Sequence, residues 1–210
     1  LLALLEQRME ENETIYDVAT QSGEKVTVAV FTTDASSFRV SLSSSNVTAV
    51  SVGLCLESGE LIYGLTERLR DSAVLIPELH GPMAEDFSPD VVSSLNRRGE
   101  IVEMFVRPTV SLYAPFYHSS RGYGLWVEGS HPGVFDVGAS NADELRLRME
   151  TTEALGLSFN LFLGPQHQQI LKSYYEQAGY PIRVPDWAFQ HWRWRDELSE
   201  GTPGMLDGYE

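Results

Sequence analysis

An aromatic run that ends in a cluster of charges has the clearest capacity for chemistry in this sequence. Residues 185–197 contain three tryptophans and a phenylalanine, and they close with Arg195, Asp196 and Glu197. Such a run is typical of a strand that is buried along most of its length and whose far tip meets water. Charged groups at that tip can form charge-assisted hydrogen bonds, which are stronger than neutral ones. We therefore expect candidate binding residues there.

Other residue types that often carry catalysis lack suitable partners in the sequence. Ser119 and Ser120 have no general base in their sequence context, and Glu67 with Arg68 is interpreted as a structural ion pair behind a turn. Cys55 is the only cysteine, which excludes an intrachain disulfide and a thiolate metal site. No zinc spacing relates the five histidines, so we favour structural or surface roles for them and expect no metal and no cofactor. They are His80, His118, His131, His167 and His191.

The composition predicts a globular and strongly acidic protein. Thirty Asp and Glu against 15 Lys and Arg give a formal net charge of -15 over 210 residues. Repulsion of that sign opposes nucleic-acid backbones and anionic membranes as partners. No run reaches the roughly 20 apolar residues of a membrane helix. Residues 1–5 lack the basic flank of a signal peptide, which slightly favours the cytoplasm, although a natural beginning before Leu1 can have been removed.

Alternating hydrophobicity predicts many short strands, an arrangement typical of a β-sandwich. Val26, Val28 and Val30 share one parity, the pattern of a half-buried strand. Ser58-Gly59 is expected to form a hairpin turn between two strands. Residues 1–12 suit either a short helix or an edge strand. Further strands are expected at residues 38–42, 47–57, 60–65, 101–106, 111–117, 124–128, 145–151 and 157–163.

One helix is predicted at residues 165–178, where Pro165 suits the first turn and Gly179 the position after the end. Pro181 and Pro185 then favour extended backbone before them. Residues 76–94 contain three prolines and four acids, and a loop of that length is usually functional or mobile.

Five segments, read together, resemble the front of glycoside hydrolase family 31, the family of α-glucosidases and α-xylosidases. They follow the family's order at about its spacing, and the resemblance covers residues 26–197. The segments are Tyr-Gly-Leu-Thr-Glu-Arg at 63–68, Pro-Phe-Tyr-His-Ser-Ser-Arg-Gly-Tyr-Gly at 115–124, Phe-Leu-Gly-Pro at 162–165, the tyrosine pair at 174–175 and Pro-Asp-Trp-Ala-Phe at 185–189.

This resemblance implies a mainly β fold that leads into a second domain. Residues 1–164 would form an N-terminal β-sandwich of the galactose-mutarotase type, and residues 165–184 a linker helix and extended segment. Residues 185–210 would form the first strand and following loop of a (β/α)8 catalytic barrel. Family members are retaining enzymes with an Asp nucleophile and an Asp acid and base, both on later barrel strands. The resemblance thus implies an exo-acting α-glycosidase without cofactor, and no catalytic residue in this chain.

The resemblance also makes the tip of the barrel strand a candidate wall of a sugar pocket. Active sites of such barrels lie at the C-terminal ends of the strands. The indole of Trp194 can stack on a pyranose, and Arg195, Asp196 and Glu197 can hydrogen-bond sugar hydroxyls. In the opposing interpretation the tryptophans pack in the barrel core and the charges pair with one another; we favour the core for Trp187 and Trp192.

A second candidate is the family's sandwich loop that reaches over the barrel mouth. The matching region runs from Asn96 to Thr109, and Pro108 stands where many relatives have a substrate-binding Asp. A maltose-like leaving-group site is therefore in doubt. The acidic segment before this region, or Arg97 and Arg98, is expected to substitute, with Thr109 as a further candidate. The alternative is that the two arginines bridge surface carboxylates.

Two other functions stay open. One is a carbohydrate-binding or interaction module without chemistry of its own, and the other is a family member that transfers the sugar to an acceptor sugar. An oligosaccharide or glycoside is the expected ligand, and the rest of the barrel the expected partner. The sequence decides neither the sugar nor whether the protein forms a homo-oligomer.

Overall fold

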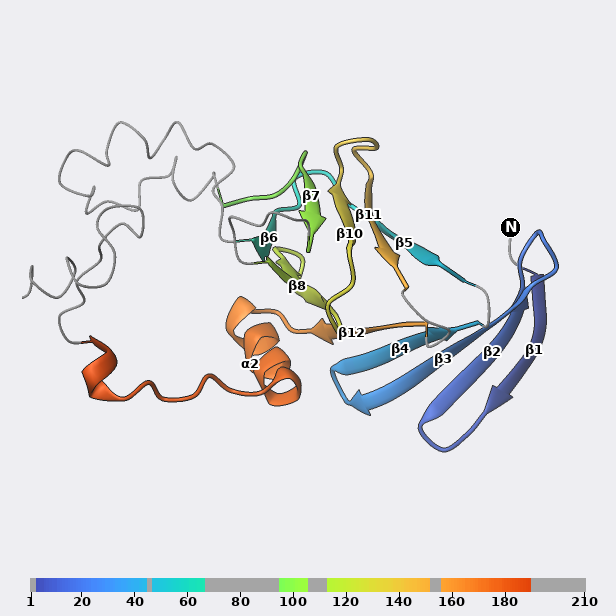
Figure 1. The fold of residues 1–210 in the computed structure, drawn as a ribbon, viewed down its shortest axis with the longest axis horizontal. Coiled ribbons are helices and arrows are strands. Elements are labelled where there is room, and N and C mark those ends of the chain that lie inside the picture. The colour runs from blue at the N-terminus through green and yellow to red at the C-terminus, as the bar shows by residue number, and fades with distance from the viewer. Residues whose placement is uncertain (1–2, 45–46, 67–94, 106–112, 152–155, 190–210) are drawn as a thin grey trace, which may run out of the picture. The chain divides into compact units, whose positions relative to one another are not determined.

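A computed structural model of the chain describes residues 3–44, 47–66, 95–105, 113–151 and 156–189. Most of these residues belong to two antiparallel β-sheets (Figure 1). The larger sheet has the strand order β1-β2-β3-β4-β12-β9-β8-β6, and the smaller has β5-β11-β10-β7. The strands are β1 Ala3–Met9, β2 Glu13–Ala19, β3 Lys25–Asp34, β4 Ser37–Ser43, β5 Ala49–Cys55, β6 Ile62–Thr66, β7 Ile101–Met104, β8 Tyr113–Ser119, β9 Tyr123–Val127, β10 Gly133–Val137, β11 Glu144–Glu150 and β12 Leu157–Leu163. The predicted mainly β sandwich is confirmed.

The core lies between the two sheets and follows the period-two pattern of the sequence. In β11, Leu145, Leu147 and Met149 are fully buried, whereas the residues between them are exposed. Phe135 on β10 and Phe159 on β12 belong to the same apolar cluster. Burial of each such side chain contributes about 1.5–3 kcal/mol relative to exposure. Strand alternation thus produces one continuous core from strands that are distant in sequence.

Helix α2, His167–Ala178, packs on the larger sheet, where its apolar stripe meets β8, β9 and β12 (Figure 1). Ile170 is fully buried in a cluster with Phe116 and Phe162. The ring of Tyr174 stacks on Phe116 with 4.1 Å between the centroids. Gly179 ends the helix at a φ of 100°, as predicted from its position. Within the described residues, no helix has the length and apolarity to cross a membrane.

The connection between β5 and β6 corrects one expectation. The two strands do not form a hairpin, because β5 pairs with β11 in the smaller sheet and β6 pairs with β8 in the larger. The turn at Ser58-Gly59 therefore carries the chain from one sheet to the other. Leu56 before the turn and Ile62 after it are both buried in the core between the sheets, which favours the crossing over a flat hairpin.

Residues 1–12, which suited a helix or a strand, contain the edge strand β1. Two strands, β2 and β10, were not predicted. Strand β10 is short and begins at the glycine of a Pro-Gly pair, a pair that usually indicates a turn.

The chain divides into two units, Leu1–Ala178 and Gly179–Glu210. In the second unit, Asp186–Phe189 forms the 3-10 turn η3. The predicted strand at 185–197 is therefore wrong for these residues, and Trp187, expected in a core, is 64% exposed. A parallel strand takes its hydrogen bonds and burial from neighbouring strands, and the described residues supply none for this segment. Residues 190–197 lie outside the described residues, so the barrel start stays a prediction.

Candidate functional site

A cavity of about 460 Å³ lies where three of the singled-out segments meet. Strand β6 contributes the Tyr-Gly-Leu-Thr segment, β8 the Pro-Phe-Tyr-His segment, and α2 follows the Phe-Leu-Gly-Pro segment. Tyr63 and His118 are direct partners in the ladder between β6 and β8, which sets both side chains at the same level of the sheet. The lining residues are Tyr63, Gly64, Thr66, Leu95, Arg97, His118, His167 and Leu171.

Gly64 is required by the close approach of β6 to β8. Its φ is 117°, and a Cβ there would stand 2.5 Å from the carbonyl oxygen of Phe116. The next residue, Leu65, is a non-glycine residue with a φ of 67°, a conformation that costs about 1–3 kcal/mol. Its side chain is fully buried in the core, which offsets this cost. The backbone at the cavity floor is thus held by packing in a strained shape.

Arg97 covers the outer edge of β6, the last strand of the larger sheet. Its amide donates to the carbonyl of Ile62 at 2.7 Å. Its guanidinium donates to the carbonyls of Gly64 at 3.2 Å and Thr66 at 2.9 Å. The amide of Ile62 donates in turn to the side-chain oxygen of Asn96 at 3.0 Å. Residues 96 and 97 therefore replace a neighbouring strand and satisfy backbone groups that an edge leaves open.

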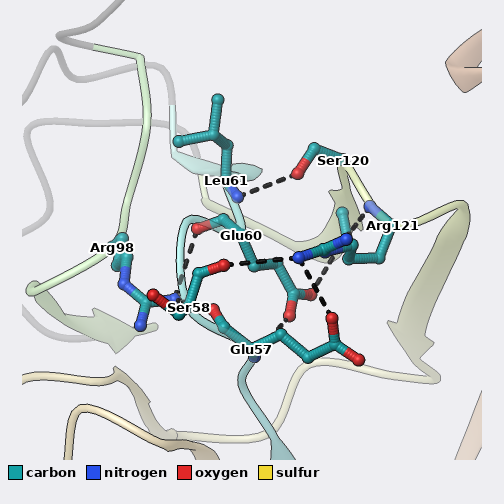
Figure 2. Close-up of polar contacts among 8 residues, drawn as sticks. Glu57, Ser58, Glu60, Leu61, Arg98, Ser120 and Arg121 are labelled. Carbon is teal, nitrogen blue, oxygen red and sulfur yellow. Dashed lines mark hydrogen bonds and ion pairs between the residues drawn. The ribbon is translucent and has the colours of Figure 1, made fainter.

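Arg98 points away from the cavity and fastens the turn at residues 57–60. It donates to the carbonyls of Glu57 at 2.8 Å and Glu60 at 3.3 Å, and to that of Ala142 at 2.8 Å. Figure 2 shows the turn between Arg98 on one side and Arg121 on the other, whose guanidinium lies 3.0 Å from the carboxylate of Glu57. The turn that joins the two sheets is therefore clamped by two arginines.

Glu60 anchors the same turn from inside and is only 1% exposed. Its carboxylate accepts hydrogen bonds from the Ser119 hydroxyl at 2.5 Å and from the Glu57 amide at 2.8 Å. Burial, together with the nearby Glu60, raises the pKa of Tyr123. Ser119, for which the sequence showed no general base, thus has a carboxylate partner. This pair is buried within the sandwich, which is the position of a structural contact.

Two histidines face each other at the cavity. His118 on β8 and His167, the first residue of α2, have their Nδ1 atoms 2.8 Å apart. The ring of Tyr63 lies against both, with centroids 5.6 and 6.0 Å away. Burial, and then the neighbouring His167, lowers the pKa of His118 to about 4. The hydrogen bond between the rings requires one Nδ1 to donate and the other to accept.

The two segments that the sequence singled out, residues 76–94 and 96–109, lie wholly or partly outside the described residues, and described residues next to these gaps are paired in one ladder. Residues 67–94 follow Thr66, residues 106–112 precede Tyr113, and Thr66 and Tyr113 are partners in the β6 and β8 ladder. Phe105, directly before the second segment, has a φ of 54°. Both non-glycine residues with a left-handed backbone among the described residues, Leu65 and Phe105, thus flank these segments.

The predicted site residues divide by whether the structure describes them. The side chains of Arg97 and Arg98 contact different parts of the sandwich, and both guanidinium groups donate to backbone carbonyls. An ion pair of Arg97 with Glu100, at 3.4 Å, adds to these. Thr109, Trp194, Arg195, Asp196 and Glu197 lie outside the described residues. Their roles, and any contact of the arginines with substrate, stay predictions.

Comparison with known proteins explains the convergence of these segments. The chain is 29% identical over 161 residues to an α-xylosidase of Emericella nidulans, a match that covers 75% of this chain and 18% of the relative. It is 33% identical over 78 residues to the α-xylosidase XylQ of Lactiplantibacillus pentosus, covering 37% of this chain and 10% of the relative. The chain is related to glycoside hydrolase family 31. The chain thus spans a fifth or less of the length of these relatives, and no family model matches it.

Solved structures confirm the N-terminal fold of the family. The cycloalternan-forming enzyme of Listeria monocytogenes, in complex with a pentasaccharide substrate, superposes with a TM-score of 0.69 at 13% identity over 89% of this chain and 23% of its own. A family 31 sulfoquinovosidase of E. rectale, in complex with an aza-sugar inhibitor, gives 0.63 at 12% identity over 99% of this chain and 30% of its own. These similarities show the fold of the sandwich.

Two features of the site escaped the sequence analysis. His118 and His167 are 49 residues apart, so a search for short metal-type spacings does not pair them. The covering of β6 by Arg97 depends on backbone carbonyls, which every residue carries, and leaves no side-chain signal. A group of three or more His, Cys, Asp or Glu side chains suited to a metal ion is absent from the described residues.

Proposed function

We propose that this chain is the N-terminal part of a retaining, exo-acting α-glycosidase that hydrolyses terminal α-linked sugars through a covalent glycosyl-Asp intermediate. The observation that carries the proposal is the match to a curated α-xylosidase over 75% of the chain. The catalytic Asp pair is proposed to lie outside this chain.

The sandwich is proposed to position segments that border the substrate. Thr66 and Tyr113, the described residues next to 67–94 and 106–112, are partners in one ladder, and Arg97 donates to the carbonyl of Thr66 at the end of β6. We place the aglycone contacts of the enzyme, with Thr109 among them, on these segments.

An α-xyloside is the first substrate to test, because both reported curated relatives are α-xylosidases. The full-length protein should release nitrophenol from a nitrophenyl α-xyloside or another nitrophenyl α-glycoside without added cofactor. A folded full-length protein that releases nothing from the α-xyloside, α-glucoside and α-galactoside would contradict the proposal. Product analysis with excess acceptor sugar separates hydrolysis from transfer.

Asp196 supplies a sharper test of the barrel tip. If it borders the pocket, Asp196→Ala in the full-length enzyme should lower kcat/KM at least tenfold, which corresponds to about 1.4 kcal/mol in the transition state. The melting temperature should change little. Glu210→Ala is a matched control that removes a carboxylate outside the proposed tip. Wild-type kcat/KM in the Asp196 variant would remove this residue from the site.

A further inference from the structure

We propose that strand β1 pairs antiparallel with β1 of a second copy of this chain and so joins two larger sheets across a two-fold axis. The paired run is residues 5–9, with Gln7 on the axis opposite its own counterpart. The inference does not depend on the proposed glycosidase activity, because it uses only residues of the sandwich.

The outer edge of β1 is open in the described part of the chain. β1 is the end strand of the larger sheet (Figure 1), and all seven of its residues are exposed. The opposite end of that sheet, β6, is covered by residues 96 and 97. Among the described residues, β1 has a backbone ladder with β2 alone. An edge with unpaired amide and carbonyl groups is a template for another strand.

The ladder between β1 and β2 fixes which backbone groups of β1 face outward. At its closed end, Glu10 and Glu13 exchange two backbone hydrogen bonds of 2.8 and 3.4 Å. Hydrogen-bonded and non-hydrogen-bonded pairs alternate along an antiparallel ladder, and the register is continuous from Met9 to Glu6. The amide and carbonyl groups of Met9 and Gln7 therefore point away from β2. Two copies centred on Gln7 can exchange two hydrogen bonds there, as a two-fold axis requires.

The side chains of β1 complement one another in this register. Glu6 comes to lie opposite Arg8 of the other copy, and Leu5 opposite Met9, each twice by symmetry. The Glu6 and Arg8 pairs are non-hydrogen-bonded, the class in which cross-strand side chains are closest. All four side chains are available, because Glu6 and Arg8 are 57% and 43% exposed, and Leu5 and Met9 are 58% and 78% exposed. This match of opposite charges and of apolar groups favours a second copy over an unrelated strand.

The same strand limits the strength of the contact. The ladder with β2 has a register shift between Leu4 and Glu6, which places a bulge at Leu5. A bulge bends a strand and interrupts regular pairing, so the paired run is short. The formal net charge of -15 on each copy adds repulsion. We therefore expect a weak and reversible dimer, as is typical of small interfaces.

Disulfide trapping of the full-length protein tests the register. Gln7→Cys would be made in a Cys55→Ser background, which removes the exposed native thiol. A hydrogen-bonded antiparallel pair places its Cα atoms about 5.5 Å apart, within the range that a disulfide spans. Glu11→Cys in the same background is the control, because Glu11 is exposed in the hairpin turn beyond the paired run. Mild oxidation should form covalent dimers at least tenfold faster in the Gln7 variant. Equal rates in the two variants, or no dimer at residue 7, would overturn the proposal.

Sedimentation velocity tests the charge match without a new thiol. Wild-type full-length protein should shift reversibly toward a dimer between about 1 and about 500 µM. Glu6→Lys sets like charges opposite each other and should raise the dissociation constant at least tenfold. Glu11→Lys makes the same change in net charge and should stay within twofold of wild type.

Melting temperatures of the two lysine variants would confirm that both are folded. A wild type that shows no association over the whole range would overturn the proposal and leave the edge to another segment of the chain or to another protein. Association that Glu6→Lys leaves unchanged would also overturn it, because a different surface would then hold the copies together.

Discussion

The sandwich and the segment that follows α2 use their apolar residues in opposite ways. The sandwich buries Tyr117, Phe135 and Phe162 completely. In the second unit, Ile182 is 90% exposed and Phe189 is 76% exposed. The sandwich thus carries its own core, whereas the described part of the second unit leaves these apolar side chains exposed. We propose that the catalytic barrel covers them.

The largest expected change in the free energy of unfolding tests this difference between the sandwich and the segment directly. In the 210-residue chain, Phe135→Ala should lower the free energy of unfolding by about 3–5 kcal/mol, because it removes a fully buried aromatic ring. Trp187→Ala should change it by less than about 0.5 kcal/mol, because that indole is mostly exposed. Urea unfolding measures both. Similar losses in the two variants would mean that the segment already has a core of its own in this chain.

Arg97 and Arg98, which are adjacent in sequence, allow a second test of stability within the sandwich. Arg97→Ala should cost about 1–3 kcal/mol, because it removes two hydrogen bonds to the carbonyls of Gly64 and Thr66 at a position that is 2% exposed. Arg98→Ala, at a less buried position, should cost about 1 kcal/mol or less. Chemical denaturation of both variants under one buffer gives the ranking. A larger loss for Arg98 would show that the turn at 57–60 matters more than the strand edge.

The smallest expected effect concerns how the stability of the protein depends on pH through Asp17 in the larger sheet. Lys25, Thr27 and Arg8 surround the buried carboxylate of Asp17 and lower its pKa from 3.8 to about 2. A carboxyl group whose pKa is lower in the folded than in the unfolded protein stabilises the folded state at pH values above its ordinary pKa. This contribution is lost as the pH falls toward 2. Thermal unfolding between pH 5 and pH 2 should thus show a smaller decline in Asp17→Asn than in wild type. Parallel curves would exclude this ion cluster as a source of acid sensitivity.

The sequence predicted the elements that depend on local signals. Alternating residues such as Leu145, Leu147 and Met149 mark a strand wherever one face is buried, and Gly179 marks the end of α2 by its backbone freedom. The sheet to which a strand belongs depends on long-range packing instead. The sequences of β5 and β6 predict a hairpin, but the two strands belong to opposite sheets.

The candidate site shows the same division between local and long-range information. The segment that contains Gly64 was singled out by its resemblance to the family, and the structure supplies the reason for the glycine, a close approach to the Phe116 carbonyl. The contact of His118 with His167 arises from the docking of α2 on the sheet, so no spacing in the sequence encodes it. Within the strand predicted at 185–197, Asp186–Phe189 form a 3-10 turn instead, because a barrel strand obtains its structure from neighbouring strands rather than from its own residues.

The stereochemistry of sugar release tests the glycosidase proposal most directly. The full-length protein would be incubated with an aryl α-xyloside, or with whichever aryl α-glycoside it cleaves, and the first sugar released would be followed by proton NMR. A retaining mechanism through a covalent glycosyl intermediate predicts that the α anomer appears first and then mutarotates. Initial release of the β anomer, or no release by a folded full-length protein, would contradict the proposal.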